Sequence, residues 1–112
     1  MVTELHSCGY IEPLLPDLVE IGLEMLNPLE VKAGMDPFRL KEQYGDKLAF
    51  HGGINAQLWD RPELVLAEME RIIPAMKEGG GYVFASDHSI PNSVSFETMK
   101  KIAEAAHRLG KY

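Results

Sequence analysis

The chain repeats one pattern four times: a short apolar run, a polar break, and a segment in which apolar residues recur at helical spacing. The apolar runs are nearly continuous rather than alternating, which is typical of parallel strands covered on both faces. Units of roughly 25 to 30 residues predict βα repeats joined by right-handed crossovers. The expected strands are 2–5, 24–29, 47–50 and 81–85, and the expected helices are 11–21, 36–44, 61–77 and 95–109.

Residues that start and stop helices support these boundaries. Asp36, Asp60 and Ser95 are predicted N-caps, and Gly45 and Gly110 are predicted helix stops. The expected inward faces are Val65, Met69, Ile72, Ile73 and Met76 in the third helix, and Phe96, Met99, Ile102, Ala103, Ala106 and Leu109 in the last.

The repeats predict a single α/β domain over residues 1–112, a length that suits one domain. Four βα units are half of a (β/α)₈ barrel, whose usual length is about 250 residues. A small open four-stranded α/β sheet is the competing architecture.

Composition excludes several classes of partner. The chain has 17 acidic and 11 basic residues, which argues against a nucleic-acid surface. No apolar run approaches the roughly 20 residues of a membrane span, and the start of the chain lacks the apolar region of a signal peptide. A single cysteine agrees with a reducing compartment. We therefore expect a cytoplasmic protein that binds neither nucleic acid nor membrane.

Polar side chains gather where the expected strands end, which is where α/β folds place their functional groups. The first end carries His6 and Cys8, and the second carries Asn27 and Glu30. The third carries His51 with Gly52, Gly53 and Asn55, and the fourth carries Asp87 and His88. The remaining histidine, His107, is expected on the surface of the last helix.

Thiolate, imidazole and carboxylate are zinc ligands, so His6, Cys8, Glu30 and His88 form a candidate metal set. The residues alone leave a second interpretation open. A lone cysteine is more often a buried small hydrophobe, a loop glutamate is more often solvated, and Asp87 with His88 also suits a simple helix-entry loop.

Three stretches of the sequence resemble the carboxyl-terminal part of the uroporphyrinogen decarboxylase superfamily. They are "LHSCGYIEPLLPDLVEIGLEMLNPLE", "DPFRLKEQYGDKLAFHGGIN" and "GGGYVFASDHSIPNSVSFETMKKIAEAAHRLGKY", and they follow one another in order. The resemblance implies the carboxyl-terminal half of a (β/α)₈ barrel. It also implies one of two activities: decarboxylation of uroporphyrinogen without a cofactor, or zinc-dependent methyl transfer between corrinoid proteins and thiols or other acceptors.

The His6-Ser7-Cys8 motif resembles the His-x-Cys zinc motif of the methyltransferases, which decarboxylases lack. His88 stands where those methyltransferases have a second cysteine, so the third ligand departs from their pattern. Decarboxylases have a histidine in the loop that matches His88, and Asp87 with His88 is the catalytic pair that this alternative would use. The nearest branch is therefore the zinc-dependent one, with a corrinoid protein or a small molecule as partner.

The resemblance places further strands and helices upstream of Met1. Either the chain is a fragment, or a half-barrel pairs with another copy. Because a four-stranded parallel sheet has two edges that need covering, we expect a homo-oligomer. We expect little or no catalysis from the isolated chain, and a non-catalytic half-barrel that serves as an assembly module is the third alternative.

Overall fold

Four parallel strands form one sheet in the computed structural model, which describes all residues from 1 to 112. The strands are β1 (Glu4–His6), β2 (Met25–Asn27), β3 (Ala49–His51) and β4 (Tyr82–Val83), and they lie side by side in that order. Each strand is parallel to its neighbour, with Leu5 opposite Leu26 and Leu26 opposite Phe50. The predicted α/β class and the parallel sheet of four βα repeats are confirmed.

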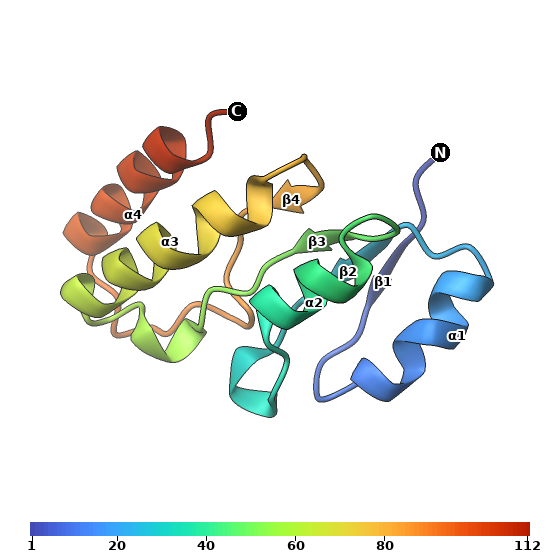
Figure 1. Cartoon of the computed structure of the whole chain (residues 1–112). Coiled ribbons are helices and arrows are strands. Elements are labelled where there is room, and N and C mark those ends of the chain that lie inside the picture. Colours follow the sequence, from blue (N-terminus) through green and yellow to red (C-terminus); the bar gives the residue numbers. More distant parts are fainter.

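A helix follows every strand, and the helices line up along the sheet (Figure 1). They are α1 (Leu15–Glu20), α2 (Pro37–Tyr44), α3 (Pro62–Lys77) and α4 (Phe96–Leu109), with single 3₁₀ turns η1 (Glu12–Leu14), η2 (Val31–Ala33) and η3 (Ala56–Leu58). Right-handed crossovers that always advance in the same direction place all helices on one face of a sheet. This is the winding of a (β/α) barrel segment, and it differs from a doubly wound sheet, which reverses direction.

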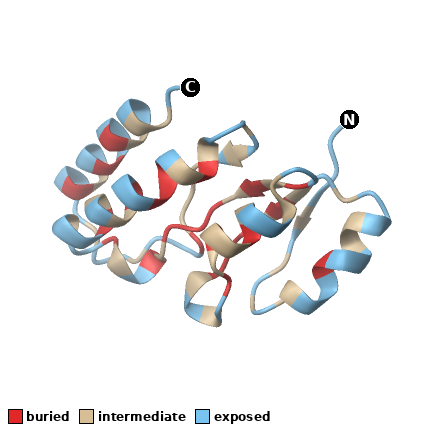
Figure 2. Ribbon diagram, in the orientation of Figure 1, coloured by how far each residue is buried: buried red, intermediate tan, exposed pale blue.

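The two faces of the sheet differ in burial. Leu26 and Phe50 are fully buried, whereas His6 and Val83, which point to the other face, are exposed. Figure 2 shows buried stretches, in red, along β3 in the middle of the sheet. The prediction of strands covered on both faces is therefore wrong for this chain. The apolar runs of the sequence include residues that point away from the helices, and alternation along a strand puts every second side chain on that open face.

The predicted boundaries of the last three helices hold to within one residue, but the first prediction is wrong. Instead of one helix over 11–21, the chain forms the 3₁₀ turn η1 and then the short helix α1, because Pro16 has no amide hydrogen to donate back into a longer α-helix. Asp36 and Ser95 are N-caps, and their side chains accept hydrogen bonds from the amides of Phe38 and Thr98. Asp60 is not a cap, because α3 begins one residue later than predicted and no side chain caps it. The Asp60 carboxylate instead accepts a hydrogen bond from the Ser93 hydroxyl at 2.9 Å.

The apolar stripe predicted for α3 is confirmed, since Val65, Met69, Ile72, Ile73 and Met76 are all buried. The prediction for α4 is wrong at two positions. Phe96 is 84% exposed and Ala103 is also exposed, while Thr98, Ile102 and Ala105 form the buried face. Phe96 lies two residues from Thr98, about 200° around the helix, so both cannot face α3.

The strands end at slightly different places from those predicted, and this shift sets the site. β1 runs through His6, and β2 stops at Asn27 before the cis peptide bond to Pro28 rather than reaching Leu29. β3 runs through His51. As a result, His6 and His51 are strand residues and not loop residues, and Asn27 is the last residue of β2. None of the helices is long and apolar enough to span a membrane.

Candidate functional site

His6, Asn27 and His51 occupy one row across the sheet. His6 is paired with Asn27 across β1 and β2. Leu26 is paired with Phe50 across β2 and β3, so the residues that follow them, Asn27 and His51, share the same row. Side chains in one such row point to the same face, here the face not covered by helices. The carboxyl ends of the first three strands therefore present imidazole, amide and imidazole groups side by side.

A cavity of about 190 Å³ opens at this end of the sheet. Most of its walls are polar, and they come from the last residues of β1 and β2 and from the segments that follow β1, β2 and β4. The structure thus brings four predicted site residues, His6, Cys8, Asp87 and His88, to one hollow. The lining residues are His6, Cys8, Asn27, Pro28, Ser86, Asp87, His88 and Ser89.

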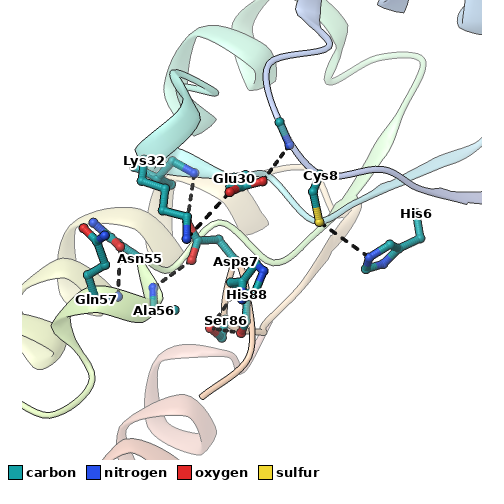
Figure 3. A network of polar contacts seen from close by, with 12 residues as sticks. His6, Cys8, Glu30, Lys32, Asn55, Ala56, Gln57, Ser86, Asp87 and His88 are labelled. Atoms are coloured by element: carbon teal, nitrogen blue, oxygen red, sulfur yellow. Dashed lines mark hydrogen bonds and ion pairs between the residues drawn. The ribbon is translucent and has the colours of Figure 1, made fainter. Parts of the chain in front are cut away.

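The sulfur of Cys8 faces the ring of His6 (Figure 3). The distance from Cys8 Sγ to His6 Nε2 is 3.9 Å. The other ring nitrogen, Nδ1, lies 2.5 Å from Oδ1 of Asn27. The thiol is exposed and unpaired, so it is available to a ligand in the cavity.

This pair fits two corners of a zinc site. Zinc bonds of about 2.1 Å to nitrogen and 2.3 Å to sulfur at a tetrahedral angle place the two ligand atoms about 3.6 Å apart, close to the observed separation. Metal-binding histidines also use their second ring nitrogen to hydrogen-bond a neighbour, as His6 does with Asn27. The donor set is incomplete, since no three His, Cys, Asp or Glu side chains lie close enough together to hold a metal ion.

Glu30 lies apart from that cavity. Its side chain is almost buried, and Oε2 accepts a hydrogen bond from the Gly9 amide at 2.6 Å. The ammonium of Lys32 lies 3.8 Å from the other carboxylate oxygen, as Figure 3 shows. The carboxylate thus anchors the loop that carries Cys8, and the prediction that Glu30 binds the metal stays a prediction.

Asp87 is fully buried and ties together loops from different parts of the chain. Its Oδ1 accepts from the Ala56 amide at 2.7 Å, and its Oδ2 accepts from the Val31 amide at 2.9 Å. Its own amide donates to the Ile54 carbonyl. Asp87 therefore joins the segments that follow β2, β3 and β4, while its predicted catalytic role stays a prediction.

His88 is exposed at the rim, next to this buried anchor. Its amide donates to the Ser86 hydroxyl at 3.3 Å, and that hydroxyl donates to the His88 carbonyl at 2.6 Å. The backbone of His88 is thus held while its imidazole borders the cavity. His107 is exposed on α4, as predicted.

The sequence interpretation missed a second polar pair on the open face. Nδ1 of His51 lies 2.8 Å from Oε1 of Glu4, which reaches across β2. Glu4 and His6 are two residues apart in one strand, and this spacing places them on the same face. This spacing is the signal that the sequence offers, and it is hidden when residues 2–5 are read only as an apolar run.

Close backbone packing fixes the shape of the turn after β3. Gly52 has φ of 110°, and a Cβ there would lie 3.2 Å from the Ser86 carbonyl oxygen. A side chain would therefore push β3 away from the loop that carries His88. Gly52 is therefore required for the observed position of that loop.

Comparisons with known proteins agree with this architecture. A family model described as "Uroporphyrinogen decarboxylase (URO-D)" matches residues 2–109. A uroporphyrinogen decarboxylase of Pseudoalteromonas atlantica is 33% identical over 69 residues, and one of Nitrosospira multiformis is 31% identical over 72 residues. A third, from Vesicomyosocius okutanii subsp. Calyptogena okutanii, is 27% identical over 75 residues.

These matches cover 61%, 63% and 66% of this chain, respectively. They cover only 19%, 20% and 22% of the relatives, so the chain matches about a fifth of their length. The family model, by contrast, spans nearly the whole chain. The chain belongs to the uroporphyrinogen decarboxylase family.

Proposed function

We propose that this chain is the carboxyl-terminal half of a (β/α)₈ barrel and carries the zinc-binding part of a methyl-transfer site. The reaction class is transfer of a methyl group from a corrinoid protein to a thiol or another acceptor. The sequential order of the four parallel strands supports the half-barrel. The isolated chain is expected to hold the metal but to catalyse little or nothing.

One observation carries this proposal: the Cys8 sulfur and the free nitrogen of His6 face each other across 3.9 Å at the mouth of the sheet. A soft thiol beside an imidazole is a donor pair that suits zinc. His88 borders the same cavity and is the third ligand that we propose, although its ring would have to move closer to the pair to reach a shared metal ion. Glu30, which lies apart from the cavity, is a further candidate.

The chain's own residues would orient this donor pair. Glu30 holds the Gly9 amide, which fixes the loop next to Cys8. Asp87 holds the amides of Val31 and Ala56, which fixes the rim next to His88. When bound, zinc lowers the pKa of a coordinated thiol, so that the sulfur is a thiolate at neutral pH.

A decarboxylase-like lyase is the second candidate, and the names of the relatives favour it, since all three are uroporphyrinogen decarboxylases. In that alternative, Asp87 and His88 would act on a tetrapyrrole carboxylate at the same cavity. Both carboxylate oxygens of Asp87 are already engaged by backbone amides, which leaves His88 as the more available group.

The homo-oligomer expected from the sequence also stays a proposal, as does a cytoplasmic location. β1 and β4 form the two edges of the sheet in this chain. A second copy that covers both edges, without catalysis, is the assembly-module alternative. Size-exclusion chromatography with light scattering would separate a stable dimer from a monomer.

Elemental analysis tests the metal proposal. The chain is expressed with zinc in the medium, purified without added metal, and dialysed against a weak chelator. We expect close to one zinc per chain in the wild type and a clear loss of zinc in Cys8→Ala. His107→Ala is the matched control, because it removes an exposed histidine far from the cavity and should leave the zinc content unchanged.

The opposite pattern would reject the methyl-transfer proposal: a folded wild-type chain with no zinc, or equal zinc in Cys8→Ala. A titration with uroporphyrin, used as a stable probe, then examines the lyase alternative. Binding that His88→Ala abolishes would favour that alternative.

A further inference from the structure

Asn27 makes two hydrogen bonds whose directions can be worked out from chemistry alone. Its Nδ2 lies 3.1 Å from the backbone carbonyl oxygen of His51, on the neighbouring strand β3. Its Oδ1 lies 2.5 Å from Nδ1 of His6, on the opposite neighbour β1. The amide therefore bridges the three strands at the row where the cavity opens.

A backbone carbonyl can only accept a hydrogen bond, so the group that faces His51 must be the amide NH₂. The amide oxygen of Asn27 then faces His6, and this oxygen can also only accept. The donor must be Nδ1 of His6, which carries the ring hydrogen. A neutral imidazole has one such hydrogen, so Nε2 holds a lone pair, and it is this nitrogen that faces Cys8.

The opposite tautomer is disfavoured twice. With the hydrogen on Nε2, the lone pair of Nδ1 would face the lone pairs of Asn27 Oδ1 at 2.5 Å. Turning the Asn27 amide over would relieve that repulsion. It would, however, place its oxygen against the His51 carbonyl and lose the second hydrogen bond.

We propose that Asn27 is a positioning residue that fixes His6 in the Nδ1–H tautomer and so keeps the Nε2 lone pair directed at Cys8. This inference rests on the proposed zinc function for its use, but the tautomer itself exists without metal. It adds to the site a residue that touches no ligand atom of the metal and acts through His6.

Nitrogen-15 NMR of the metal-free full chain tests the tautomer directly. Spectra are recorded at about pH 8.5, some two units above the ordinary histidine pKa. We expect the His6 pattern of the Nδ1–H form in the wild type. In Asn27→Leu we expect a mixture or the Nε2–H form, because the acceptor is gone.

Asn27→Asp is the conservative variant, since its carboxylate still accepts from His6 Nδ1. It should keep the Nδ1–H tautomer even though it loses the bond to His51. Asn55→Ala is the matched control: Asn55 follows β3 and accepts a hydrogen bond from the Gln57 amide, so its loss should not change the His6 spectrum.

Zinc affinity, measured by competition with a chromophoric chelator, gives the second readout. We expect a loss of about 10- to 100-fold in Asn27→Leu, the usual effect of removing the partner of a metal-binding histidine. Asn27→Asp should stay within ten-fold of the wild type.

An unchanged Nδ1–H tautomer in a folded Asn27→Leu chain would overturn the inference. If Asn27→Leu does not fold, Asn27→Asp decides: the Nδ1–H form supports the inference, and the Nε2–H form or a mixture overturns it. A wild-type chain that binds no zinc but shows the Nδ1–H tautomer would reject the proposed function and leave the role of Asn27 intact.

Discussion

Asp87 accepts a hydrogen bond from the backbone amide of Val31, which lies 56 positions earlier in the chain. The same carboxylate also accepts from the Ala56 amide. One buried side chain thus connects three loops at the end of the sheet where the strands present His6, Asn27 and His51. The geometry of the site consequently depends on Asp87, although both oxygens of its carboxylate already accept hydrogen bonds from backbone amides.

Asp87→Ala should destabilise the chain by about 2–4 kcal/mol, because it leaves two backbone amides without their acceptor in a largely buried place. Urea unfolding followed by circular dichroism measures this change. Asp60→Ala is the control, since that carboxylate is exposed and should cost about 0.5 kcal/mol or less. Similar values for the two variants would show that Asp87 does not anchor the loops.

Glu30→Gln separates the two roles considered for that residue. We expect zinc affinity to stay within a few-fold of the wild type, because the glutamine oxygen can still accept from the Gly9 amide. The measurement is again competition with a chelator. A loss of more than about ten-fold would instead identify Glu30 as a metal ligand.

Tyr82 should make the chain sensitive to alkaline pH. Burial raises the pKa of its hydroxyl, and Tyr112 adds to the increase. Above about pH 10, the ordinary tyrosine value, the unfolded chain loses this proton while the folded chain keeps it. The free energy of unfolding of the wild type therefore falls with pH, by at most about 1.4 kcal/mol per pH unit for this group.

The variant Tyr82→Phe measures that effect. Near pH 8 it should be about 1 kcal/mol less stable than the wild type, since the hydroxyl donates to the Gly52 carbonyl at 2.8 Å. The difference should shrink as the pH rises above about 10. Urea unfolding at several pH values gives the comparison, and a constant difference would contradict this account.

Shortening a side chain to alanine should cost more stability on the helix-covered face of the sheet than on the open face. Phe50→Ala removes a fully buried ring and should cost about 3–5 kcal/mol. Val83→Ala acts on a side chain that is 42% exposed and should cost about 1 kcal/mol or less. Comparable losses in urea unfolding would mean that the open face is covered in solution, as a second copy of the chain would do.

Much of the fold could be predicted from sequence because its signals are local. Asp36 and Ser95 cap helices where short polar side chains meet exposed amides, and the stripe from Val65 to Met76 repeats at helical spacing. Phe96 shows the limit of such patterns. This apolar residue of α4 stays exposed because α4 packs against α3 through another face, the one that carries Thr98, Ile102 and Ala105.

The site was predictable only in part. Strand ends placed His6, Cys8, Glu30, Asp87 and His88 in one region. In the structure all of them except Glu30 line one cavity. The hydrogen-bond partners were not predictable, because they depend on register: Asn27 reaches His6 only because the two residues are paired across β1 and β2. Likewise, nothing local in the sequence links Asp87 to Val31.

X-ray absorption at the zinc edge is the most direct test of the central claim that His6 and Cys8 bind one metal ion. We expect a sulfur neighbour at about 2.3 Å and nitrogen neighbours at about 2.0–2.1 Å. In Cys8→Ala the sulfur contribution should disappear. A zinc-loaded wild-type chain with only oxygen and nitrogen neighbours would contradict the claim.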